Sequence, residues 1–130
     1  MDTLYREEIL EHYRDPQNFG VLEDYDMKSH QHNPFCGDDI ELFVKFQNPS
    51  PSLSPKQGEG VLSEISFYGT GCAISIASGS ILTEFAKGKA KEELLAISDT
   101  DMVDMLGVEV SETRKKCALL TLWTLRDCLK

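Results

Sequence analysis

The chain has 130 residues, 41% of them hydrophobic, which is enough for one compact domain with a single core. Its 22 acidic and 13 basic residues give a net charge of -9, which argues against binding to nucleic acid or to an anionic membrane surface. The first ten residues lack the cationic start and apolar stretch of a secretory signal, and no apolar run reaches the roughly 20 residues of a membrane span. We therefore expect a cytoplasmic protein, one domain over residues 1–130, whose four cysteines are free thiols or metal ligands.

The start of the chain predicts a short amphipathic helix. Residues 3–14 place Tyr5, Ile9 and Tyr13 four positions apart, and the sequence Asp15-Pro16 ends the pattern. The stretch that follows, through Phe19, has no regular period and is interpreted as irregular.

The middle of the chain predicts antiparallel strands. Residues 40–46 alternate between apolar and other side chains, which is the period of a half-buried strand, and residues 61–68 form a second, less regular strand. Between them, residues 48–60 are rich in proline, serine and glycine, a composition that favours turns. We interpret this segment as a hairpin loop.

The second half is predicted to be mainly helical. A helical period runs from Cys72 to Gly88, shorter helices are expected near residues 91–97 and 102–106, and a last helix begins near Ser111. Ser98, Asp99 and Thr100 can cap the second short helix, and Gly107 can close it. The element order predicts an α+β fold, with a small antiparallel sheet of three strands covered on one face by helices.

Cys36 and Asp38 lie in a turn sequence just before the first clear strand. Pro34 and Gly37 favour a bend there, and the bend could direct the thiolate and the carboxylate toward one ion. A Cys-x-Asp pair is weak evidence when taken alone.

Cys72 opens a helix after Gly69-Thr70-Gly71. The helix N-terminus would stabilise its thiolate, and the glycines would let the backbone approach a bound ion. For a lone cysteine the alternative of a small buried hydrophobic residue ranks ahead, but these two features favour a functional role.

Cys117 follows the basic residues Arg114, Lys115 and Lys116, which lower the pKa of a neighbouring thiol, although a solvated basic face is the plainer interpretation. Cys128 lies about 16 Å further along the same helix and cannot share a tetrahedral site with Cys117. His32 precedes Cys36 and is a weaker ligand candidate. Spacing alone leaves a shared site of Cys36, Asp38, Cys72 and Cys117 open.

Two other classes of protein compete with a metal-thiolate protein. A zinc hydrolase would need a general base near the metal, and no His-x-Glu or His-Glu-x-x-His pattern occurs in the sequence. A plain interaction module with incidental cysteines would be no less stable without metal.

Around its cysteines the sequence resembles the U-type iron-sulfur cluster scaffold family, which comprises IscU, SufU and the N-terminal domain of NifU. The similar segments follow one another in the same order along nearly the whole chain: Glu8 to Asn18, Asn33-Pro34-Phe35-Cys36-Gly37-Asp38, Phe67 to Ser75, and Arg114-Lys115-Lys116-Cys117-Ala118.

The resemblance implies that Cys36, Cys72 and Cys117, with Asp38 beside them, hold zinc or an iron-sulfur cluster of the [2Fe-2S] or [4Fe-4S] type. It also implies a pyridoxal-phosphate-dependent cysteine desulfurase of the SufS or IscS kind as partner, and apo iron-sulfur proteins or carriers as acceptors. A hard carboxylate among soft thiolates suits a site that releases its cargo.

Within the family the motifs resemble the SufU branch most closely. IscU proteins have a histidine before the third cysteine, where this chain has Lys116, so Asp38 is the expected fourth ligand and Arg114 its expected partner. The persulfide acceptor would be Cys36 in a SufU-like protein and Cys117 in an IscU-like one. Only 44 residues separate Cys72 from Cys117, which is close to the IscU length.

The predicted function is therefore a scaffold and sulfur acceptor in iron-sulfur cluster assembly, and not an enzyme that turns over small molecules. The alternative is a zinc-bound sulfur-transfer protein that activates the desulfurase without holding a cluster itself. The Leu-Pro-Pro-Val-Lys stretch through which IscU meets its chaperone is absent, so that contact is not expected.

Overall fold

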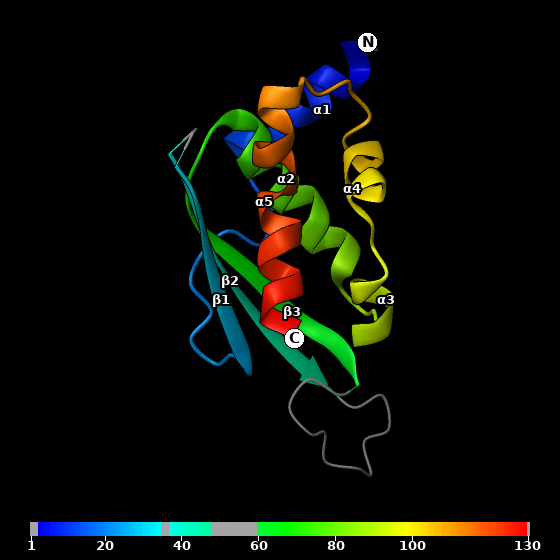
Figure 1. The fold of residues 1–130 in the computed structure, drawn as a ribbon. Coiled ribbons are helices and arrows are strands. Elements are labelled where there is room, and N and C mark those ends of the chain that lie inside the picture. The colour runs from blue at the N-terminus through cyan, green and yellow to red at the C-terminus, as the bar shows by residue number, and fades with distance from the viewer. Residues whose placement is uncertain (1–2, 35–36, 48–59, 130) are drawn as a thin grey trace.

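The computed structural model describes residues 3–34, 37–47 and 60–129 of the chain. It has a three-stranded sheet with helices packed against it (Figure 1), which confirms the predicted α+β class. The elements in chain order are α1 (Thr3–Arg14), β1 (Met27–Asn33), β2 (Asp38–Gln47), β3 (Val61–Thr70), α2 (Ala73–Ala86), α3 (Lys91–Leu95), α4 (Asp99–Leu106) and α5 (Glu112–Leu129). No described helix is long and apolar enough to cross a bilayer.

The sheet is antiparallel, with β2 in the centre between β1 and β3. The even-numbered residues Ile40, Leu42 and Val44 of β2 are fully buried against the helices. The strand pairing places Asn33 opposite Asp38 and His32 opposite Asp39. Because successive side chains on a strand point to opposite faces, Asp38 faces the helices and Asp39 faces away from them.

Helices α2 and α5 form the layer that covers the sheet, α5 over β1 and β2 and α2 beside β3 (Figure 1). Helix α1 packs on α2, and α4 packs on both α2 and α5, so neither lies on the sheet. The close approach of α2 to β3 requires Gly79, because a Cβ there would lie 2.6 Å from Cε2 of Phe67.

Helix α5 is buried on more than one side. Thr121 and Thr124 are fully buried beside the leucines of this helix. The hydroxyl of Thr124 donates to the carbonyl of Leu120 at 2.7 Å, so one buried polar group is satisfied within the helix itself.

The caps of α4 lie where the sequence places them. Ser98 is the N-cap and accepts a hydrogen bond of 3.0 Å from the backbone N–H of Asp101. Gly107 ends the helix with a φ of 69°, a left-handed conformation that favours glycine.

Strand β1 occupies residues whose sequence pattern does not predict a strand. Its outward side chains Lys28, His30 and His32 are exposed, and the inward Ser29 and Gln31 are polar, so no apolar alternation marks it. Its pairing with β2 makes it a strand. Most of the proline-rich segment predicted as a hairpin loop, residues 48–59, lies outside the described residues.

The segment before β1 is irregular, as expected, but it covers part of the sheet. The backbone N–H of Asp26 donates to the carbonyl of Val44 at 2.8 Å. The ring of Tyr25 lies 5.5 Å from that of Phe43, which is buried on the face away from the helices. In α1, Ile9 is buried but Tyr13 is 44% exposed, so Tyr13 is not part of the core.

Candidate metal centre

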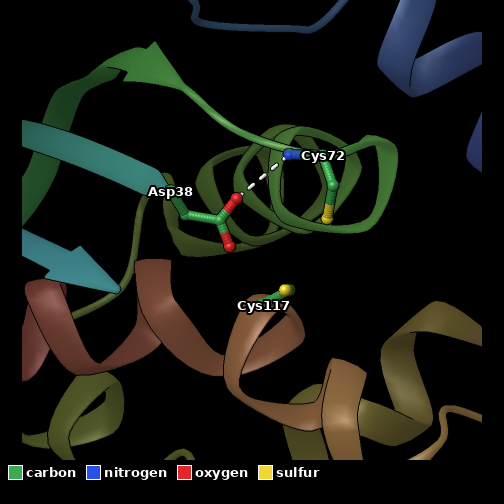
Figure 2. A group of neighbouring side chains, drawn as sticks. All are labelled: Asp38, Cys72 and Cys117. Atoms are coloured by element: carbon green, nitrogen blue, oxygen red, sulfur yellow. Dashed lines mark hydrogen bonds between the residues drawn. The ribbon is translucent and has the colours of Figure 1, made fainter. Parts of the chain in front are cut away.

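Asp38, Cys72 and Cys117 meet at one end of the sheet, although 33 residues separate Asp38 from Cys72 and 44 separate Cys72 from Cys117. One ligand atom from each lies within 4.8 Å of the other two. Figure 2 shows the Asp38 carboxylate and the two sulfur atoms directed toward a common space. A strand, a helix N-terminus and the second turn of another helix each contribute one ligand atom.

Asp38 is the first residue of β2 and its side chain is fully buried. Its Oδ1 accepts a hydrogen bond of 3.0 Å from the backbone N–H of Cys72 and another of 3.3 Å from the hydroxyl of Ser75. Its Oδ2 is buried and has no hydrogen-bond partner among the described residues. Burying a carboxylate oxygen without a partner is costly, so this oxygen is free to bind a cation.

Cys72 is the N-cap of α2, as the sequence predicts, and its side chain makes no capping hydrogen bond. The residue before it must be glycine. A Cβ on Gly71 would lie 2.1 Å from Oγ of Ser75 and 2.9 Å from Oδ1 of Asp38. The absence of a side chain at Gly71 thus lets the helix start approach the carboxylate.

The surroundings of Cys72 favour its thiolate overall. Burial raises the pKa of Cys72, but hydrogen bonds from the backbone N–H and hydroxyl of Ser75 and from the Cys117 thiol outweigh burial and leave the pKa below its ordinary value. The negative charge of Asp38 acts in the opposite direction. Thiolate is the form of cysteine that binds metal and attacks sulfur.

Cys117 lies in the second turn of α5 and is fully buried. Lys116 and Arg114, on the same helix, are exposed. The predicted pairing of Arg114 with Asp38, and a supporting role for Lys116, stay predictions.

The remaining candidates fall elsewhere. Cys36 lies outside the described residues, between β1 and β2. His32 is exposed on β1 and does not belong to the group formed by Asp38, Cys72 and Cys117. Cys128 is buried near the end of α5, and burial raises the pKa of its thiol to about 12, with the nearby Asp127 adding to the effect.

Ser75 contributes to this centre and was missed by the sequence analysis. It is fully buried, and its hydroxyl lies within hydrogen-bond distance of Asp38 Oδ1 and of the carbonyl of Cys72. The available signal was its position three residues after an N-cap, where polar side chains interact with the start of a helix.

The donor set of the described residues fits a thiophilic metal. Two thiols and a carboxylate suit zinc and also iron in a cluster, and an open position remains for a further ligand. The buried Oδ2 of Asp38, which has no hydrogen-bond partner in the ranges that the structure describes, supports this fit.

Comparison with known proteins places the chain in a family. The model of the NifU-like N-terminal domain matches residues 4–130. The chain belongs to this family. This confirms the resemblance found in its cysteine motifs.

Two similar proteins are a SufU and an IscU. The zinc-dependent sulfurtransferase SufU of Bacillus subtilis is 36% identical over 113 residues, which is 87% of this chain and 69% of SufU. The iron-sulfur cluster assembly scaffold protein IscU 1 of Archaeoglobus fulgidus is 33% identical over 104 residues, which is 80% of this chain. This chain spans only 61% of that IscU.

A solved structure has the same fold. It is the crystal structure of a proposed iron-sulfur cluster assembly scaffold protein for the SUF system of Fervidobacterium islandicum AW-1. The two folds superpose with a TM-score of 0.78 over 98% of both chains, at 26% sequence identity.

Proposed function

We propose that this protein accepts sulfur from a cysteine desulfurase and takes part in iron-sulfur cluster assembly at a centre made of Cys36, Asp38, Cys72 and Cys117. The observation that carries the proposal is the convergence of Asp38, Cys72 and Cys117, with one buried carboxylate oxygen that has no partner in the described part of the chain. Cys36 is two residues from Asp38, so the backbone holds their Cα atoms within about 7 Å of each other. This tether supports Cys36 as the fourth ligand.

Sulfur transfer at this centre is a thiolate exchange. The acceptor thiolate attacks the terminal sulfur of the persulfide on the desulfurase, the sulfur–sulfur bond of the donor breaks, and the desulfurase cysteine leaves as a thiolate. The step is balanced without an added oxidant or reductant. The acceptor is Cys36 in a SufU-like mode and Cys117 in an IscU-like mode.

A groove next to the centre supports docking of the sulfur donor. It has a volume of about 540 Å³ and is lined by residues of α1, the segment after it, the Gly69–Gly71 segment and α2. Tyr13 and Phe19 line it and are 44% and 40% exposed. Gly71 lies at the groove and directly precedes Cys72, so a donor segment seated there would reach the ligand residues.

The alternative is a zinc-bound sulfur-transfer protein that activates the desulfurase and holds no cluster itself. The similarity to the zinc-dependent SufU of Bacillus subtilis favours this alternative. Both functions use the same ligands, and zinc held by thiolates would keep the cysteines ordered until sulfur arrives.

Elemental analysis and an ultraviolet-visible spectrum of anaerobically purified protein distinguish the scaffold from the sulfur-transfer protein. Tightly held zinc without visible bands supports the sulfur-transfer protein, and iron with sulfide and charge-transfer absorption supports the scaffold. Persulfide uptake from a purified cysteine desulfurase is then measured by mass spectrometry for the Cys36→Ser and Cys117→Ser variants. If both variants take up sulfur as the wild type does, neither acceptor mode is correct.

A further inference from the structure

Two histidines and two carboxylates lie on the opposite face of the sheet from the cysteines. His30 and His32 both point outward from β1, because they are two residues apart on one strand. Asp39 and Glu41 point outward from β2 in the same way. The strand register pairs His32 with Asp39 and His30 with Glu41.

The two strands bring these side chains within reach of one another. Residues directly opposite on antiparallel strands have Cβ atoms about 5 Å apart, so Asp39 is within reach of His32. The Nε2 atom of His30 contacts Oδ1 of Asp39 diagonally across the two strands. Asp39 is thus adjacent to both histidines.

The chemistry of this group differs from that of the cysteine centre. Two imidazoles and one carboxylate on one face form a donor set that favours divalent transition metals such as Fe²⁺, Co²⁺, Ni²⁺ and Zn²⁺. The side chains of His30 and Asp39 are 55% and 47% exposed, so an ion would enter and leave directly from solvent. The side chain of His32 is exposed, and exposed side chains change rotamer rapidly, which lets His32 turn toward an ion held by the other two. Glu41, which is half-buried, lies opposite His30.

We propose that His30, His32 and Asp39, with Glu41 beside them, form an exchangeable site for a divalent transition-metal ion, separate from the cysteine centre. The net charge of -9 attracts cations to the protein. The site lies at the same end of the sheet as the cysteine centre, because Asp39 directly follows Asp38. It does not depend on the proposed sulfur-transfer function.

Cobalt is the probe that separates the two sites. Untagged protein is first loaded with one equivalent of zinc and then titrated with Co²⁺, with binding followed by calorimetry and by the visible spectrum. Cobalt at the histidine site gives weak d–d bands, whereas cobalt bound by cysteine gives intense sulfur-to-metal charge transfer. We expect one saturable equivalent without charge transfer, and paramagnetic broadening of the imidazole signals of His30 and His32.

Substitutions of the proposed ligands test which residues bind the cobalt ion. The double change His30→Ala with His32→Ala should abolish this binding, and Asp39→Asn should weaken it by at least about tenfold. His12→Ala is the matched control, since His12 lies on α1 with its Nδ1 atom 2.6 Å from Ser80 Oγ, and it should leave cobalt binding unchanged. Circular dichroism checks that each variant is folded.

Three results would overturn the proposal. They are the absence of saturable Co²⁺ binding to the zinc-loaded protein, binding by the double histidine variant equal to that of the wild type, and charge-transfer bands showing that cobalt enters the cysteine centre.

Discussion

The backbone N–H of Cys72 donates a hydrogen bond of 3.0 Å to Oδ1 of Asp38, and this bond joins the start of α2 to the start of β2. It occupies one oxygen of the carboxylate and leaves the other, which is buried, without a partner among the described residues. The same contact therefore fixes the position of a candidate ligand and orients its second oxygen. It also explains why a glycine precedes Cys72, since a side chain at Gly71 would collide with this carboxylate.

Changing Asp38→Asn should separate metal binding from folding. The amide oxygen can still accept the hydrogen bond from Cys72, but the negative charge is lost, so zinc affinity should fall by at least about tenfold. The metal-free variant should melt at least as high as the metal-free wild type, because a neutral amide is less costly to bury than a carboxylate. Competition with a chromophoric chelator and thermal unfolding measure the two effects.

Asp104→Asn is the matched control, because Asp104 is an exposed carboxylate on α4 and belongs to neither proposed metal site. Its zinc affinity at the cysteine centre should equal that of the wild type. Equal zinc affinity of Asp38→Asn and the wild type would show that Asp38 is not a ligand.

Two glycine substitutions should have similar effects on stability and different effects on metal binding. The added Cβ of Gly71→Ala would lie 2.1 Å from Ser75 Oγ, and that of Gly79→Ala would lie 2.6 Å from Cε2 of Phe67. Overpacking of this kind lowers the free energy of unfolding by about 1–3 kcal/mol. Denaturant titration should show this loss for both variants, while only Gly71→Ala should weaken zinc binding. Weaker zinc binding by Gly79→Ala would argue that the centre depends on general packing rather than on the approach at Gly71.

Cys128 should make the protein less stable at alkaline pH. Burial raises the pKa of its thiol in the folded protein to about 12, whereas in the unfolded chain it is near the ordinary value of 9.0. The unfolded chain therefore loses the proton first, and the stabilising effect of the neutral thiol is full below about pH 9 and declines as the pH rises toward about 12. Denaturant titrations of the wild type and Cys128→Ala across this range should show a smaller alkaline decline for the variant. Equal declines in stability for the wild type and Cys128→Ala would mean that other groups cause the loss of stability at alkaline pH.

Alkylation provides an independent measurement of the same thiol. At neutral pH Cys128 should react slowly with iodoacetamide, with or without zinc. Cys72, which is only partly buried, should react in the metal-free protein and be protected by zinc. Peptide mass spectrometry distinguishes the two sites.

Arg126 should stabilise the packing of α4 on α5. Its guanidinium donates to Oδ1 of Asp99 at 2.8 Å and to the carbonyl of Ile97 at 2.7 Å. Because the side chain is partly exposed, Arg126→Ala should lower the free energy of unfolding by only about 1 kcal/mol. Lys87→Ala removes an exposed pair with Glu84 at the end of α2 and should change the free energy of unfolding by less than about 0.5 kcal/mol. Zinc affinity should be unchanged in both variants. A lower zinc affinity of Arg126→Ala would show that the packing of α4 affects the metal centre.

Periodicity was sufficient to predict most of the helices and the two strands with apolar residues. Their signals are local, since a helix or a half-buried strand repeats its apolar residues at a fixed spacing. Strand β1 has no such signal, because its outward residues are polar and its inward residues include Ser29 and Gln31. Only the pairing with β2 makes it a strand, and pairing is a property of two segments together.

The sequence by itself determined which residue types were available for metal chemistry and, through its motifs, the family. It could not determine whether Asp38, Cys72 and Cys117 lie close together, and their spacing left that question open. The tertiary structure decided it, because the inward face of β2 and the starts of α2 and α5 meet at the same end of the sheet. Ser75 and the outward group of His30, His32 and Asp39 were likewise defined only by packing and strand register. The physical reason is that hydrogen bonds and coordination depend on distances between atoms, and residues distant in sequence approach one another only when the core is packed.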